Sequence, residues 1–185
     1  GGANLVGYYM YHGGSHPIGK LSTLEEPGYS VINYDFQAAI GEFGQTNTKY
    51  HLLRRFHLFL HDYGDLLAPM VPVLPQQRPE GPEDVETLRF MARVQGDAGF
   101  LFVSNYQRYV ESKPLVGQIA LTLPNGTTCI PRKPFTLPEK ALAIWPFNLS
   151  LEGVVLKHAT AQPLAHVQVD EDAYYFFFAH EDISP

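Results

Sequence analysis

From Glu86 to the C-terminus, the chain is a succession of short β-type segments separated by Gly, Pro and Asn turns. Val116–Leu123 alternates apolar and polar residues with the period of two typical of a half-buried strand, and Asn125-Gly126 after it is a strong hairpin signal. Because no helical pattern interrupts these segments, they predict antiparallel strands in a β-sandwich or open barrel. The expected strands, about eight, are Thr87–Val94, Gly99–Gln107, Val116–Leu123, Thr127–Pro131, Ala141–Phe147, Gly153–His158, Leu164–Val169 and Ala173–Phe178.

The segment Tyr174–Phe178 reads Y-Y-F-F-F, which is too apolar for a strand with one face in water. A continuous apolar run predicts a strand buried on both faces. We therefore expect a central strand here, with the helix described next as the candidate cover of its second face.

Thr46–Tyr63 is the one segment with sustained helical periodicity. Its start can be capped by Thr46 or Asn47, whose side chains accept hydrogen bonds from the first turn. Gly64 can adopt a positive φ, so the helix is expected to end there. Apolar residues recur at spacings of three and four and form one packing stripe: Tyr50, Leu53, Phe56, Leu60 and Tyr63.

The N-terminal part begins with a nearly unbroken apolar and aromatic run, Leu5–His12, followed by Gly13-Gly14. Such a run predicts a strand buried on both faces, as in a parallel sheet. Gly14–Ser30 is rich in Gly, Pro and Ser and predicts a loop long enough to have a function of its own.

A proline-rich stretch, 65–85, separates the helix from the β-type segments. Prolines make a chain stiff, extended and poor at strand pairing, so we place a linker here. The predicted organisation is a strand, loop and long helix in 1–64, the linker, and a β-sandwich in 86–185. The fold class is α+β, mostly antiparallel β.

Composition excludes several classes of function. The net charge is −6, and no cluster of Lys and Arg favours nucleic acid. One cysteine, Cys129, excludes an internal disulfide and a cysteine-based metal site. No apolar run approaches the roughly 20 residues that span a membrane, and no signal peptide is visible.

Two carboxylates lie in an aromatic, glycine-bounded context: Asp35 between Tyr34 and Phe36, and Glu42 between Gly41 and Phe43. They are candidates for orienting a functional loop, but satisfying loop N–H groups is the favoured role. His57 and His61 have helical metal-ligand spacing without a third ligand, which favours surface histidines and no metal site.

Several motifs in one order resemble the family-35 glycoside hydrolases, the bacterial β-galactosidase type, built on a TIM barrel followed by β-domains. Tyr8–Gly14 (Y-Y-M-Y-H-G-G) is similar to the last barrel strand, and Ile32–Gly44 (I-N-Y-D-F-Q-A-A-I-G-E-F-G) to the segment after it. Gly99–Arg108, Ile144–Asn148 and Ala159–Gln162 are similar to the β-domain behind the barrel.

Both glutamate motifs that carry catalysis in this family are absent from the chain. A complete barrel takes about 250 residues, and fewer than 50 precede the helix here. The resemblance therefore implies the C-terminal segment of a β-galactosidase-like hydrolase, inactive alone, with no catalytic residue of its own. It implies a galactoside ligand, no cofactor or metal, and an exported or periplasmic parent.

Within this segment, the resemblance assigns sugar contacts to Tyr9, Tyr34 and Phe36. Phe36 stands where the family has a second tyrosine, so it keeps a stacking face and lacks the hydroxyl. Ser15-His16 and Ala39 also depart from the family pattern.

Two other classes of function remain open. A carbohydrate-binding β-sandwich would need exposed aromatics, for which Trp145 and Tyr106 are the candidates. A protein-interaction domain would use the apolar N-terminal strand and the helix stripe, because an unpaired strand favours self-association.

Overall fold

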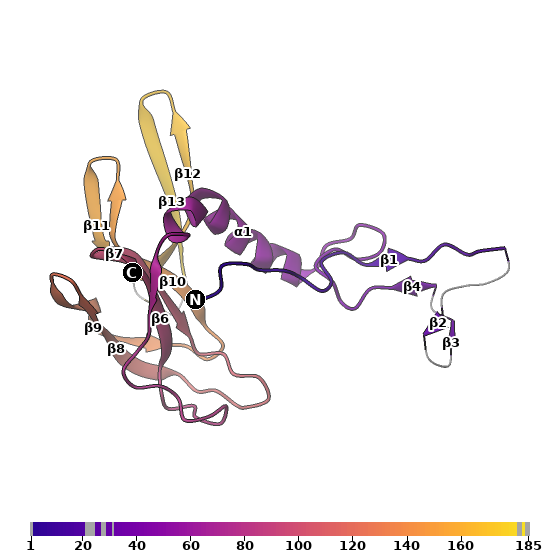
Figure 1. Ribbon diagram of the computed structural model, residues 1–185, viewed down its shortest axis with the longest axis horizontal. Coiled ribbons are helices and arrows are strands. Elements are labelled where there is room, and N and C mark those ends of the chain that lie inside the picture. The colour runs from indigo at the N-terminus through magenta and orange to yellow at the C-terminus, as the bar shows by residue number, and fades with distance from the viewer. Residues whose placement is uncertain (1, 21–24, 27–28, 31, 181–182, 184–185) are drawn as a thin grey trace. The chain divides into compact units, whose positions relative to one another are not determined.

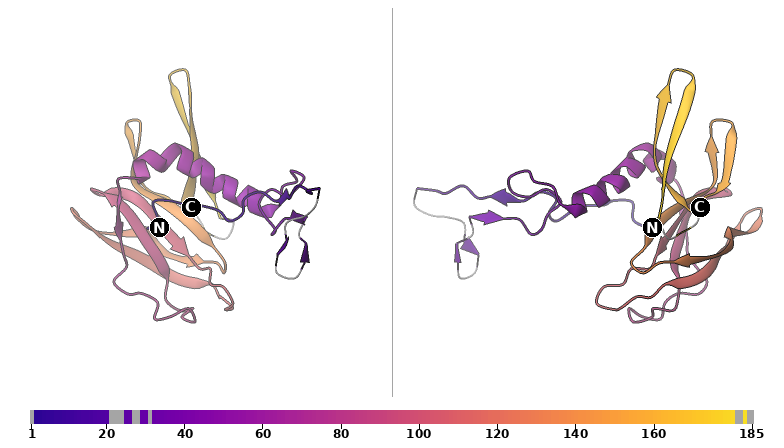
Figure 2. Two further views of the ribbon diagram at one scale, coloured as in Figure 1. Left: turned by 45° about the vertical axis from the view of Figure 1, so that its right-hand side comes forward. Right: turned by 180° about the vertical axis from the view of Figure 1, so that it is seen from behind.

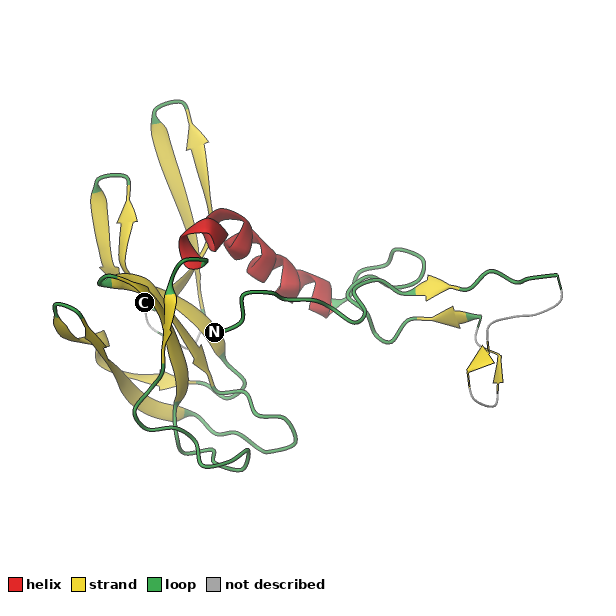
Figure 3. Ribbon diagram, viewed as in Figure 1, coloured by secondary structure: helices red, strands yellow, loops and turns green. Residues whose placement is uncertain are grey.

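The computed structural model describes all residues except 1, 21–24, 27–28, 31, 181–182 and 184–185 (Figure 1). Two compact units are present. One is Leu5–Leu58, and the other combines Gly1–Asn4 with Phe59–Pro185. Helix α1 (Thr48–Leu67) contributes its first part to the smaller unit and its second part to the larger one. The described residues form one helix and thirteen strands, drawn in red and yellow in Figure 3, which confirms the α+β, mostly antiparallel class.

Helix α1 begins at Thr48, two residues after the predicted start, and Asn47 is the one of the two cap candidates that caps it. The Asn47 side-chain oxygen accepts a hydrogen bond from the backbone N–H of Lys49 at 2.8 Å, as a helix cap does. Its end was predicted wrongly, since the helix continues through Gly64 to Leu67. No helix in the described part of the chain is long and apolar enough to cross a membrane.

A buried arginine stabilises this later helix end. Arg93 is 6% exposed, and its Nε donates to the carbonyl of Met70 at 2.8 Å. Its Nη2 donates to the carbonyls of Leu67 at 3.2 Å and Ala68 at 3.4 Å. The last carbonyls of a helix lack intrahelical partners and carry its partial negative charge, so a cation is favourable there. A glycine cap is not needed.

The smaller unit has only short strands. β1 (Gly14–Ser15) pairs with β4 (Asn33–Tyr34), and β2 (Glu25–Glu26) pairs with β3 (Tyr29–Ser30). Leu5–His12 does not form the predicted buried strand, because Leu5 and Tyr9 are 86% and 92% exposed. A strand of a parallel sheet needs neighbours on both sides, and within the described residues of this unit only an isolated bridge, His12 to Ile40, supplies pairing.

The larger unit is organised around a five-stranded antiparallel sheet with the order β11-β10-β7-β6-β5. Its strands are β5 (Val71–Val73), β6 (Arg89–Gln95), β7 (Ala98–Ser104), β10 (Leu142–Leu151) and β11 (Val154–His158). β5 lies inside the predicted proline-rich linker and pairs with β6, with Pro72 on the sheet edge. An edge position tolerates proline because one side of the strand needs no N–H donor.

A hairpin of β8 (Leu115–Leu123) and β9 (Gly126–Leu137) forms a second layer. β8 buries Leu115, Ile119, Leu121 and Leu123 while Val116 and Thr122 between them are exposed, as the alternation predicts. These residues pack in one core with side chains of the larger sheet, which include Ala92, Val94, Leu101, Val103, Trp145 and Phe147. Two layers around one core confirm the predicted sandwich-like arrangement.

The other face of the sheet meets the second half of helix α1. Phe59 is fully buried, and its ring contacts Phe100 of β7 edge-on at 5.2 Å. Tyr63, 4% exposed, also contacts Phe100, at 6.0 Å. Burial and the nearby carboxylate of Asp62 raise the pKa of Tyr63 to about 12. Both faces of β7 are therefore buried. Phe100 faces the helix, and the next residue, Leu101, belongs to the core between the two layers.

The remaining hairpin, β12 (Ala161–Val169) and β13 (Asp172–Ala179), corrects the prediction of a central last strand. Tyr174 and Phe176 are each 49% exposed, so one face of β13 is open. Figure 2 shows this hairpin projecting beyond the large sheet. The helix covers β7 instead. It meets the hairpin at His166, whose backbone N–H donates to Asp62 at 2.7 Å and whose ring lies 6.0 Å from the Tyr63 ring.

The turns follow local chemistry closely. Gly96, with φ of 61°, lies in the turn between β6 and β7, which pair from Gln95 and Ala98 onward. The β8–β9 turn is displaced by one residue from the Asn-Gly prediction, because Leu123 pairs with Gly126. β6 to β13 supply the eight strands expected in 86–185 among the described residues.

Replacing Arg93 with alanine should lower the free energy of unfolding by about 3 kcal/mol, because buried carbonyls of the helix end lose a charged donor. The free energy of unfolding of Arg93→Lys should lie between those of the wild type and Arg93→Ala, because lysine keeps the charge but lacks the planar guanidinium. Urea denaturation measures both. Arg108→Ala is the control. Arg108 is exposed and its guanidinium lies 4.6 Å from the Tyr109 ring centroid, so its loss should change stability by less than about 0.5 kcal/mol. Equal losses for Arg93→Ala and Arg108→Ala would contradict this role.

Candidate functional site

Two loop segments of the smaller unit lie side by side and form the candidate site. Gly13 donates its N–H to the carbonyl of Ile40 at 2.8 Å, and Ile40 donates to Tyr11 at 2.9 Å. His16 donates to the carbonyl of Ile32 at 2.6 Å. The segments that the sequence singled out, Tyr8–Gly14 and Ile32–Gly44, are thus joined through their backbones.

Gly13 sits where no side chain fits. A Cβ atom there would lie 2.9 Å from the Asp35 carboxylate, the backbone nitrogen of Glu42 and the carbonyl oxygen of Tyr34. At Gly14, a Cβ would lie 2.7 Å from the Tyr34 hydroxyl and 3.0 Å from its ring. The two glycines therefore allow the loops to approach and let the Tyr34 ring lie across the backbone.

Both acidic residues of the site are engaged within the loops. Asp35 Oδ1 accepts the backbone N–H of Glu42 at 3.2 Å. Glu42 Oε1 in turn accepts a hydrogen bond from the hydroxyl of Ser15. Satisfying a loop N–H is the role that the sequence favours for Asp35, and the geometry agrees with it.

An aromatic group is presented beside these carboxylates. The rings of Tyr34 and Phe36 are 6.1 Å apart, and His16 lies 4.8 Å from Tyr34. Phe36 is 65% exposed and has a φ of 49°, in the left-handed region that residues other than glycine seldom occupy. Gln37 follows with a φ of 53°, and its carbonyl accepts a hydrogen bond from Lys49 Nζ at 2.9 Å. A strained turn of this kind is often found where side chains are displayed for function.

The structure brings together two of the three predicted sugar contacts. Tyr34 and Phe36 are neighbours, whereas no ring contact joins Tyr9 to either of them in the described part of the chain. The other tyrosines of the N-terminal run turn to the helix: the Tyr8 hydroxyl and His57 Nε2 are hydrogen-bonded at 2.8 Å. Burial, followed by the nearby Tyr11, raises the pKa of Tyr8.

The histidine pair of the helix is divided between different partners. His57 contacts Tyr8, while His61 Nδ1 lies 2.6 Å from Asp62 Oδ1. Burial would raise the pKa of Asp62, but hydrogen bonds from His61 and the His166 backbone lower it overall. Among the described residues, no group of three His, Cys, Asp or Glu side chains could hold a metal ion.

Of the aromatics considered for a binding module, only Tyr106 reaches solvent. Trp145 is 1% exposed and packs edge-on against Phe135 at 4.9 Å. Tyr106 is 51% exposed.

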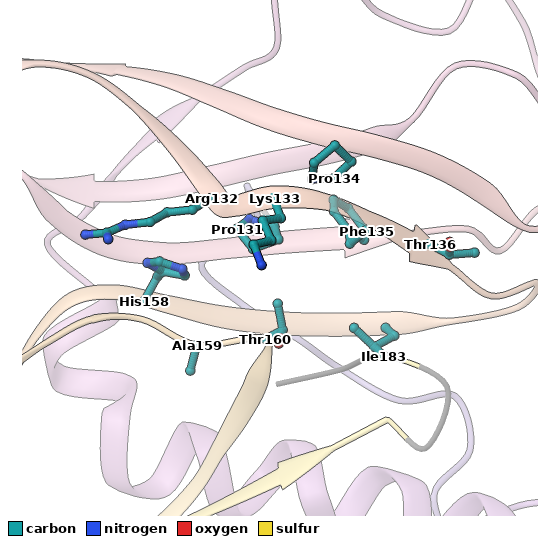
Figure 4. Close-up of a pocket in the computed structure, with 10 residues that line it drawn as sticks. All are labelled: Pro131, Arg132, Lys133, Pro134, Phe135, Thr136, His158, Ala159, Thr160 and Ile183. Atoms are coloured by element: carbon teal, nitrogen blue, oxygen red, sulfur yellow. The ribbon is translucent and has the colours of Figure 1, made fainter.

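A separate hollow in the larger unit is lined by residues to which the sequence analysis assigned no site (Figure 4). The available signal was Pro131-Arg132-Lys133-Pro134, a basic pair between two prolines. The strand expected here, Thr127–Pro131, ends at this motif, whereas β9 continues through it to Leu137.

Comparisons with known proteins give one finding on relationship. No known protein-family model matches the chain. A stretch of 106 residues, 57% of the chain, is 31% identical to a protein described as "Probable beta-galactosidase 2" from Dictyostelium discoideum, and it spans 12% of that protein. The similarity supports a galactosidase-like relationship.

Gly13→Ala should loosen the site, because its Cβ would lie 2.9 Å from backbone atoms of Tyr34 and Glu42. Amide hydrogen exchange at Ile40 and Glu42 should accelerate by about tenfold or more. Gly7→Ala is the matched control, since no atom lies within 4 Å of its added Cβ. Unchanged exchange in Gly13→Ala, or equal acceleration in both variants, would show that the close approach is unimportant.

Proposed function

We propose that this chain is the C-terminal segment of a family-35 glycoside hydrolase of the bacterial β-galactosidase type, whose parent hydrolyses terminal β-galactosides. The observation that carries the proposal is the 31% identity to a probable β-galactosidase over 106 residues. The collinear motifs Tyr8–Gly14 and Ile32–Gly44 support it, because hydrogen bonds join them into one site.

In this proposal the chain supplies one wall of the sugar site and no catalytic carboxylate. Retaining hydrolysis needs two carboxyl groups about 5–5.5 Å apart across the glycosidic bond, one as acid and one as nucleophile. Asp35 and Glu42 instead hold the loop, through the Glu42 N–H and the Ser15 hydroxyl. The exposed ring of Phe36, backed by Tyr34, offers a flat apolar surface to the apolar face of galactose.

The isolated chain should not hydrolyse p-nitrophenyl β-D-galactopyranoside, because both carboxylates serve the loop. Its rate should equal that of an Asp35→Asn, Glu42→Gln double variant. Release of nitrophenol measures both rates. Turnover that the double variant abolishes would mean that this pair is catalytic and that the mapping onto the family is wrong.

Galactoside binding should survive without catalysis and should depend on Phe36. Titration with methyl β-D-galactopyranoside, followed by nuclear magnetic resonance, should shift ring signals of Tyr34 and Phe36 with a Kd in roughly the millimolar range. Phe36→Ala should weaken binding about tenfold, the value of one aromatic contact.

Phe43→Ala is the matched control for this titration. Phe43 is on the same loop and is 85% exposed, but it makes no ring contact with Tyr34 in the described residues. Its replacement should leave the Kd unchanged. Equal weakening in both variants would remove the Tyr34–Phe36 pair from the sugar site.

A further inference from the structure

Strand β9 carries a large irregularity in its pairing with β8. Gly117 pairs with Phe135 and Ile119 pairs with Ile130, so residues 131–134 face Gln118 alone. The Gln118 side chain donates to the carbonyl of Arg132 at 2.6 Å and holds the bulge in place. Bulges re-aim side chains and are frequent beside functional sites. Here the re-aimed side chains are Arg132 and Lys133.

The bulge forms one wall of a pocket with a volume of about 750 Å³. Figure 4 shows residues 131–136 on one ribbon facing His158, Ala159, Thr160 and Ile183 on the other side. Pockets that bind small molecules typically have volumes of about 300–1,000 Å³. This pocket is therefore large enough for one or two sugar rings.

Among the described lining residues of the pocket, the side chains that can carry a charge are all basic. Arg132, Lys133 and His158 line it, and no Asp or Glu is among its described lining residues. This local excess contrasts with a net charge of −6 for the chain. Like charges gathered in one hollow repel one another unless an anion enters, and an arginine can hold a carboxylate through two parallel hydrogen bonds.

The rest of the lining adds an apolar surface and hydroxyl groups. Phe135 is 9% exposed and is fixed by the Trp145 ring, which meets it at 80° and 4.9 Å. Ile183, 3% exposed, also lines the pocket, and Thr136 and Thr160 carry hydroxyls. A ligand that combines a carboxylate, hydroxyls and an apolar face would match these groups.

We propose that this pocket binds a sugar acid, with its carboxylate held by Arg132 and Lys133 and its ring over the apolar wall. The inference stands on the bulge, the volume and the charge of the larger unit. It does not depend on the proposed galactosidase relationship, because the pocket contains no residue of the Tyr34–Phe36 site.

The test is isothermal titration of the whole chain with D-galacturonate, D-galactose and acetate at one ionic strength. Galacturonate should bind saturably. Galactose, which lacks the charge, and acetate, which lacks the ring, should each bind at least about tenfold more weakly. Arg132→Gln with Lys133→Gln should weaken galacturonate binding by about tenfold or more. Both side chains are exposed, so the variant should fold normally, as thermal unfolding will show.

Two control variants make the result specific. Lys20→Gln with Arg54→Gln removes the same charge from exposed positions in the smaller unit and should leave the Kd unchanged. Phe36→Ala should also leave it unchanged, which separates this pocket from the proposed galactoside site. The proposal is overturned if galactose or acetate binds as tightly as galacturonate, if the lysine–arginine control loses binding equally, or if no titration saturates.

Discussion

A single buried guanidinium determines how the helix and the sheet of the larger unit fit together. Arg93 projects from β6 and donates to carbonyls of Leu67, Ala68 and Met70. The carbonyls of Leu67 and Ala68 lie at the negative end of the helix, where a cation is favourable. With the helix end fixed, Phe59 and Tyr63 lie on Phe100 and bury the second face of the sheet.

The sequence predicts the strands of 86–185 well because their signals are local. Alternation in β8 depends on neighbouring residues, and it is found as expected. Features set by distant partners were missed. The helix continues past Gly64 to Leu67, whose carbonyl accepts a hydrogen bond from Arg93. Tyr174–Phe178 is half exposed on one face, while the helix packs on β7. Hydrophobicity alone shows that a segment is apolar, and it does not show what covers it.

The candidate site shows the same limit. Two loops approach each other at Gly13, where a Cβ atom would lie 2.9 Å from the Asp35 carboxylate and from the Glu42 nitrogen. The exposure of Leu5–His12 was not predictable from its composition. A buried strand requires paired neighbours, and among the described residues of this unit only the bridge from His12 to Ile40 supplies pairing. The bulge in β9 was not predicted, because the register between β8 and β9 is a property of the strand pair and cannot be read from either strand alone.

Two arginines of this chain show why burial and partners must be considered together when a cation is interpreted. Arg93 is almost completely buried, and backbone carbonyls account for its hydrogen bonds to the helix end, so its role is structural. Arg132 is exposed and is followed by Lys133 on the bulge. The Gln118 side chain holds the bulge by donating to the backbone carbonyl of Arg132, so this bond uses neither charged group. Bending strand β9 at the bulge does not require two adjacent positive charges. The basic pair is better explained by an anionic ligand that enters the pocket from solvent.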